Sequence, residues 1–142
     1  MAVHQHHISR VDEIEHALAR TLEAWPMVRA AWLFGSIATA SAGPLSDVDV
    51  AVLGAEALSF DERARLVVDL SAAARRSCDV VVVEQASPVL SMAIVDTGRR
   101  FFCRDIDAAE AWEERALRHF LGTVELRRIV YSYVREDLRA AR

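Results

Sequence analysis

Two aspartates one residue apart, Asp47 and Asp49, are the residues of this chain best suited to metal chemistry. They follow a Gly35-Ser36 pair and lie between apolar runs, which predicts a strand, a turn, a loop and a second strand. Side chains alternate along a strand, so both carboxylates face one side while the neighbouring valines face a core. Carboxylates this close repel each other unless a cation neutralises them, and Mg²⁺ takes oxygen ligands from carboxylates and phosphates. The pattern therefore predicts a metal and nucleotide site.

A third acid, Asp79, opens the next apolar strand, and a neighbouring strand would bring it to the first pair. Three carboxylates can hold two Mg²⁺ ions, which clamp the attacking and leaving oxygens of an in-line displacement. Asp47 and Asp49 would be ligands, and Asp79 would be a ligand and the general base for an acceptor hydroxyl. The simpler interpretation of Asp79 is a polar residue at the entry of a strand. The Gly35-Ser36 turn offers backbone N–H groups and a hydroxyl to phosphate oxygens.

The elements that position these residues follow from hydrophobic periodicity and from capping signals. Strands alternating with helices predict an α/β (α+β) fold, a small mixed sheet flanked by helices. Residues 1–8 are expected to fray. We expect one domain over 1–142, with a catalytic core over about 9–105 and C-terminal helices over about 106–142. The expected elements are a helix over 9–25, strands over 28–34 and 47–53, a helix over 59–76, a strand over 79–84, a helix over 87–98, a strand over 100–104, and helices over 107–142 with a break at Gly122-Thr123.

Composition narrows the class of protein. All seventeen basic residues are arginine, so arginine must fill every cationic role, and the net charge of −4 argues against general nucleic-acid binding. No apolar run approaches the roughly 20 residues of a membrane span, and the N-terminal residues lack the apolar core expected of a signal peptide. Cys78 and Cys103 lie in apolar runs without metal-ligand spacing, which favours reduced core thiols. We therefore expect a cytoplasmic protein without membrane contact.

The motif resembles that of the minimal nucleotidyltransferases of the DNA polymerase β superfamily, in which an apolar residue and Gly-Ser precede Asp-x-Asp by ten to twelve residues. Phe34-Gly35-Ser36 and Ser46-Asp47-Val48-Asp49 match it. The resemblance implies the nucleotidyltransferase fold, with the nucleotide held at Gly35, Ser36 and Thr39. It also implies Mg²⁺ held by Asp47, Asp49 and Asp79, and transfer of a nucleoside monophosphate from the triphosphate.

The resemblance extends to MntA-type antitoxins over roughly residues 28–120, through the segments 85–90, 97–100 and 104–105. It implies a complex with a HEPN-domain (HepT-like) ribonuclease toxin, and transfer of AMP from ATP onto a tyrosine hydroxyl of that toxin. One departure is that Thr39 and Ala40 stand where the family usually has arginine and glycine. Either an arginine elsewhere compensates, with Arg63, Arg99 and Arg100 as the candidates, or catalysis is weaker and the nucleotide preference differs.

Two other functions stay open. The chain is an antitoxin that works by stoichiometric binding, with a vestigial site, or it modifies a small molecule such as an aminoglycoside. Small-molecule enzymes of the superfamily generally carry a larger second domain, for which this chain is short. The C-terminal helices bear apolar and aromatic residues at helical spacing together with seven arginines, which fits either self-packing or docking to a partner.

Overall fold

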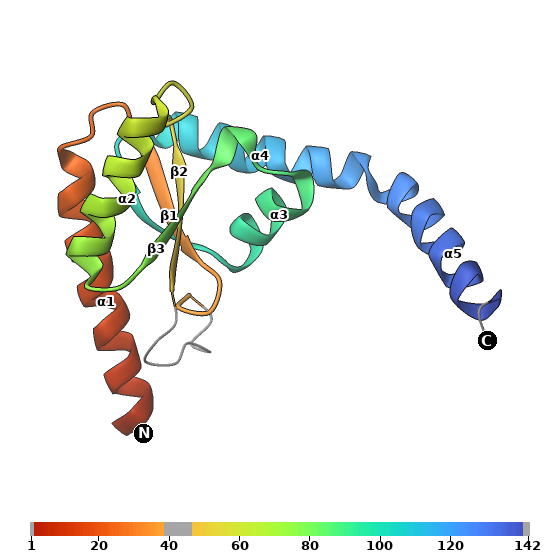
Figure 1. Cartoon of the computed structure of the whole chain (residues 1–142), viewed down its shortest axis with the longest axis horizontal. Coiled ribbons are helices and arrows are strands. Elements are labelled where there is room, and N and C mark those ends of the chain that lie inside the picture. Colours follow the sequence, from red (N-terminus) through yellow and green to blue (C-terminus); the bar gives the residue numbers. More distant parts are fainter. Residues whose placement is uncertain (1, 39–46, 141–142) are drawn as a thin grey trace.

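The computed structural model describes residues 2–38 and 47–140, and it forms a four-stranded sheet with helices on both faces (Figure 1). The strand order is β3-β2-β1-β4. Strand β1 runs antiparallel to β2 and β4, and β2 runs parallel to β3, so the predicted mixed α+β sheet is confirmed. The elements are α1 (Ala2–Glu23), β1 (Ala30–Phe34), β2 (Val48–Leu53), α2 (Phe60–Ala74), β3 (Cys78–Val82), the short 3₁₀ helix η1 (Val83–Gln85), α3 (Pro88–Thr97), β4 (Arg99–Cys103), α4 (Ile106–Gly122) and α5 (Val124–Ala140).

Two apolar layers hold the helices to the sheet, one on each face. Helices α1 and α2 cover the first face, and α3 and α4 cover the second (Figure 1). Alternate residues of β2 supply the two layers, as the period-two pattern predicts. The first layer takes Val48, Val50 and Val52, which are fully buried. The second takes Ala51 and Leu53.

Side-chain caps fix where α2, α3 and α4 begin. The hydroxyl oxygen of Ser59 accepts a hydrogen bond from the Glu62 N–H, and that of Ser87 accepts one from the Leu90 N–H. The carboxylate of Asp105 accepts one from the Ala108 N–H in the same way. Each contact satisfies an amide that the helix cannot pair internally. The predicted starts at Ser59 and Ser87 are therefore confirmed.

The start of α1 differs from the expectation. The backbone is helical from Ala2, although residues 1–8 were expected to fray. The segment holds no proline or glycine to stop a helix, so the amphipathic helix that packs on the sheet extends backwards through it. At the other end, Arg104 donates hydrogen bonds to four backbone carbonyls around the end of α1 and the turn after it, those of Leu22, Glu23, Trp25 and Val28. This cap ties β4 to α1.

Both cysteines were expected to be core thiols, and this is correct for only one of them. Cys78 is buried at the start of β3, but Cys103 is exposed at the end of β4. Strand β4 lies at an edge of the sheet, so the apolar run around Cys103 does not bury every side chain in it.

Helix α5 leaves the body of the molecule. It continues from α4 after a break at Thr123 and projects away from the sheet (Figure 1). The predicted break at Gly122-Thr123 is confirmed. Across residues 2–38 and 47–140, no helix combines the length and the apolar character that crossing a membrane requires.

Candidate active site

Asp49 and Asp79 occupy paired positions on the parallel strands β2 and β3. Paired residues of a sheet point to the same face, so the two side chains lie next to each other on the face that α3 and α4 cover. Asp79 is exposed and Asp49 is half-buried. Asp47, two residues before Asp49, is exposed where the chain enters β2. The neighbouring strand thus brings Asp79 to the first carboxylates, as the sequence predicts.

Gly35 closes the site from the side of β1. Phe34, the last residue of β1, pairs with Asp49, and Gly35 follows it with a φ of +74°. A Cβ at this position would lie 2.2 Å from Oδ2 of Asp49. The turn therefore needs glycine both for its left-handed backbone and for the close approach of the carboxylate. Ser36 is next in the turn, whereas Thr39, predicted to bind the nucleotide, lies outside the described residues.

The three carboxylates interact electrostatically. Partial burial raises the pKa of Asp49 above its ordinary value, and the negative charges of Asp79 and then Asp47 raise it further. Asp79, Asp47 and Asp49 also help to raise the pKa of the Cys78 thiol, although burial of that thiol is the larger cause. Negative charge is therefore concentrated at this end of the sheet.

Such a donor set fits a hard divalent cation. Carboxylate oxygens are the ligands that Mg²⁺ prefers. A cation would relieve the repulsion that, after burial, helps to raise the pKa of Asp49. Within the part of the chain that the structure describes, no three His, Cys, Asp or Glu side chains form a ready-made metal centre. Repulsion among the carboxylates works against a tighter cluster until a cation is bound. Asp47, Asp49 and Asp79 are the residues that would hold the metal.

The arginines considered as replacements for the family's usual arginine are engaged elsewhere. Arg63 donates hydrogen bonds to Oε1 of Gln85 and to the Glu56 carbonyl, near the end of β3 opposite to Asp79. Arg99 forms ion pairs with two acids of α1, Asp12 and Glu15.

Arg100 pairs with Glu113 of α4, whose Oε1 also accepts a hydrogen bond from the Trp32 indole N–H. Each of these three arginines thus serves a structural contact. The structure does not bring any of them to the aspartates.

A second pair of carboxyls, Glu56 and Glu84, is not indicated by the sequence. Partial burial, and to a smaller extent a hydrogen bond with Glu56, raise the pKa of Glu84 to about 7, although the Gly54 N–H, 2.9 Å from Oε2, opposes this rise. The same hydrogen bond lowers the pKa of Glu56. One proton is therefore shared by two residues 28 positions apart in the sequence, which no local motif could indicate.

Residues 16–107, well over half of the chain, match the family described as Polymerase beta, Nucleotidyltransferase. The chain belongs to this family. Helix α5 and most of α4 lie beyond the matched residues.

Solved structures share the fold. A toxin–antitoxin with AMP-PNP superposes with a TM-score of 0.74 at 26% sequence identity, over 84% of this chain and 97% of that chain. A tri-AMPylated HEPN toxin from Shewanella oneidensis in complex with MNT antitoxin gives a TM-score of 0.71 at 23% identity, over 87% of this chain and 98% of that chain. An MntA–HepT toxin–antitoxin gives a TM-score of 0.69 at 24% identity, over 85% of this chain and 96% of that chain. No curated protein sequence matches the chain.

Proposed function

We propose that this chain is an antitoxin that transfers AMP from ATP onto a tyrosine hydroxyl of a HEPN ribonuclease toxin and so silences it. The observation that carries the proposal is the pairing of Asp49 with Asp79 beside Gly35, in a chain of the nucleotidyltransferase family. The similar structures support it, since one is a toxin–antitoxin with AMP-PNP and another holds an AMPylated toxin.

Each residue of the site has a role in this reaction. The turn at Gly35 and Ser36, with Thr39, binds the triphosphate. Asp47 and Asp49 would hold Mg²⁺, and Asp79 would be a further ligand. Bound Mg²⁺ would neutralise the charge that develops on the phosphates.

Bonds and charges balance in the transfer. The acceptor hydroxyl oxygen forms a bond to the α-phosphorus of ATP, and its proton passes to the carboxylate of Asp79. The bond from the α-phosphorus to the bridging oxygen of the β-phosphate breaks, and pyrophosphate leaves. The products are an AMP-tyrosine ester on the toxin and pyrophosphate.

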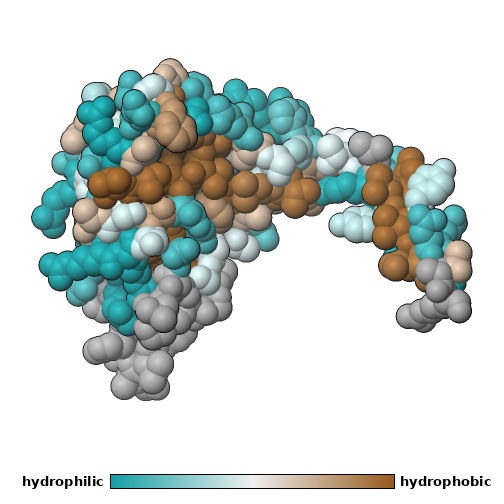
Figure 2. Space-filling model, viewed as in Figure 1, coloured by the Kyte–Doolittle hydropathy of each residue, from teal (hydrophilic) through white to brown (hydrophobic). Residues whose placement is uncertain are grey.

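A part of the proposal concerns α5. Its exposed apolar residues have no counterpart to pack against within the described residues of the body, so we assign them to docking of the toxin. The relevant side chains are Val124, Ile129, Val130, Tyr131, Tyr133, Val134 and Leu138, between 37% and 67% exposed. A helix with so wide an apolar face gains stability when a partner covers it. In Figure 2 the apolar surface runs along one side of this helix.

The exposed face of α5 also favours a second candidate function, neutralisation by stoichiometric binding alone. In that case the carboxylates would be dispensable, and the missing family arginine near the site agrees with it. The two functions can be separated by substitution, because binding would depend on α5 and AMP transfer would depend on the aspartates.

The test is AMP transfer measured by intact mass spectrometry. The purified chain is incubated with ATP, Mg²⁺ and a candidate HEPN toxin encoded beside its gene. We expect the toxin to gain mass in units of AMP, and the D47A/D49A variant to abolish the gain. A tight complex without any mass change would instead establish neutralisation by binding. Mass gain on an aminoglycoside without a protein partner would support small-molecule modification.

A further inference from the structure

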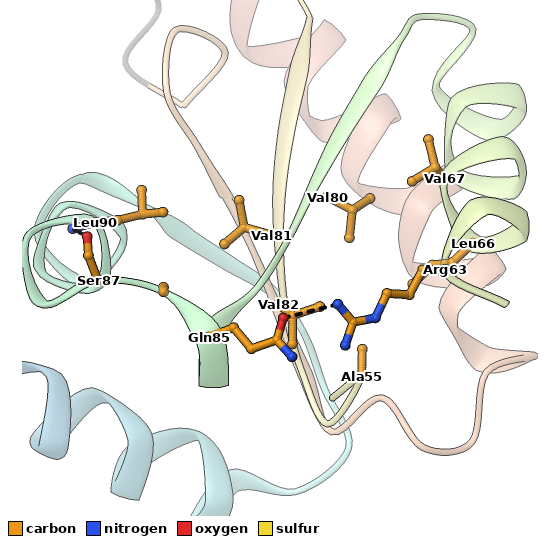
Figure 3. Close-up of a pocket in the computed structure, with 11 residues that line it drawn as sticks. Ala55, Arg63, Leu66, Val67, Val80, Val81, Val82, Gln85, Ser87 and Leu90 are labelled. Carbon is orange, nitrogen blue, oxygen red and sulfur yellow. Dashed lines mark hydrogen bonds between the residues drawn. The ribbon is translucent and has the colours of Figure 1, made fainter. Parts of the chain in front are cut away.

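A groove of about 310 Å³ runs along the outer edge of β3, between α2 and α3 (Figure 3). Val67 of α2 and Val80 of β3 line one side, and Val81 of β3 and Leu90 of α3 line the other. In Figure 2 an apolar band crosses the molecule from α2 over β3 toward α3. The groove is therefore a largely apolar channel that straddles the edge of the sheet.

Strand β3 ends the strand order, and no strand of the described chain pairs with its outer side. At a sheet edge, alternate backbone N–H and C=O groups point outward and can pair with another strand. Val80 and Val81, whose side chains point to opposite faces of the sheet, are both partly exposed at this edge. An extended peptide bound here would gain backbone hydrogen bonds and an apolar contact on each side.

The position of Asp79 determines where such a peptide would deliver a side chain. Asp79 lies on this edge strand and pairs with Asp49 on the inner side. A residue paired with Asp79 on the outer side would point to the same face, because cross-strand neighbours share a face and lie about 4.8 Å apart. Its side chain would complete a row with the two carboxylates.

The opposite end of the groove carries positive charge. The Arg63 guanidinium lies there and donates a hydrogen bond of 3.0 Å to Gln85 (Figure 3). It donates a second one, of 3.2 Å, to the Glu56 carbonyl. Each Nη atom uses one N–H in these contacts and keeps a second donor. An acidic group is the complementary ligand for this end.

We propose that the protein substrate presents its acceptor hydroxyl from an extended segment, which binds β3 as a fifth strand. The acceptor residue lies beside Asp79, and the side chain two positions away packs on Val81 and Leu90. The intervening side chain packs on Val80 and Val67, and an acidic group reaches Arg63. This inference rests on the proposed AMP transfer and defines how that reaction selects its acceptor.

The experiment compares Val67→Glu with Val68→Glu in the full chain. Val67 lines the groove, whereas Val68, the next residue of α2, is 64% exposed and does not line it. We measure kcat/KM for AMP transfer to the candidate HEPN toxin, together with the affinity of each variant for Mg²⁺-ATP. Hydrogen exchange of the β3 amides is followed in the antitoxin alone and in its complex with the toxin.

We expect Val67→Glu to lower kcat/KM about tenfold or more and Val68→Glu to leave it unchanged, with Mg²⁺-ATP affinity unchanged in both. The outward amides of β3 should exchange more slowly only in the complex. Equal transfer by the two variants would overturn this inference but leave the proposed function intact. Protection of β3 in the antitoxin alone, rising with its concentration, would assign the edge to a second copy and overturn it as well. Absence of transfer by the unmodified chain would overturn the proposed function and this inference together.

Discussion

Asp49 and Asp79 face the same side of the sheet from directly paired positions, so two carboxylates come together only because β2 and β3 are parallel and in this register. The arrangement disfavours the folded chain without a cation, since the pKa of Asp49 is raised. It also creates a site in which a bound divalent cation would relieve the repulsion between the two carboxylates. The metal binding that we propose and the stability of the fold therefore oppose each other at Asp49.

This opposition can be measured with Asp49→Asn. The raised pKa means that Asp49 contributes stability below its ordinary pKa and that this contribution is lost as the pH rises through the raised value. At pH 7 without divalent cations, the variant should therefore melt above the unmodified chain in calorimetry. AMP transfer should fall about 100-fold or more, because a proposed metal ligand is gone. A lower melting temperature for the variant would show that the carboxylate is already well compensated.

Gly35→Ala should damage both fold and site. The left-handed backbone costs a residue with a Cβ about 1–2 kcal/mol, and the added carbon would displace the Asp49 carboxylate. We expect a lower free energy of unfolding in urea and a loss of transfer. Gly122→Ala is the matched control, since a Cβ there meets nothing within 4 Å. It should leave the stability unchanged or raise it by up to about 1 kcal/mol. Equal effects of the two substitutions would contradict the role given to Gly35.

Glu84 should make the stability depend on pH near neutrality. Its pKa is raised to about 7, so its contribution is present at low pH and is lost as the pH rises through about 7. The melting temperature should fall by a few degrees between pH 6 and pH 8. Glu84→Gln should flatten this profile, while Asp61→Asn on the exposed start of α2 should not. A profile that Glu84→Gln leaves unaltered would assign the pH dependence to other groups.

The exposed face of α5 should govern affinity for the toxin without governing the fold. Val134→Glu places a charge on the apolar face, and Val134 is already 49% exposed, so the melting temperature should stay nearly constant. The dissociation constant of the toxin complex should rise about tenfold or more in a titration by calorimetry. Ser132→Glu, on the polar side of the same helix, serves as the control. Unchanged affinity in both variants would place the toxin interface elsewhere.

The sequence predicts those parts of the fold that short-range signals determine. The capping serines Ser59 and Ser87 mark the starts of two helices because each hydroxyl bonds an amide three residues on. The alternation of aspartates and valines indicates the strand and its buried face, because successive side chains of a strand point to opposite sides. These patterns depend on neighbours in the chain, which the sequence displays.

Contacts between residues of different elements are harder to predict from the sequence. The sequence suggests that a neighbouring strand brings Asp79 to the site, but the strand order and the antiparallel run of β1 need the packed structure. Arg99 pairs with Glu15 of α1, 84 positions away, and Arg100 pairs with Glu113 of the next helix, α4. No local pattern indicates either ion pair, so the sequence leaves both arginines as candidates for phosphate binding. The shared proton of Glu56 and Glu84 has the same origin.

The contrast between the two cysteines makes the protein open to selective labelling. Burial and the nearby carboxylates raise the pKa of the Cys78 thiol, which keeps it protonated and slow to react. Cys103 is exposed on β4, at the edge of the sheet opposite to β3. A fluorophore attached to that single accessible thiol would sit away from the β3 groove, so it could report rotational diffusion as a partner binds while leaving the groove unobstructed.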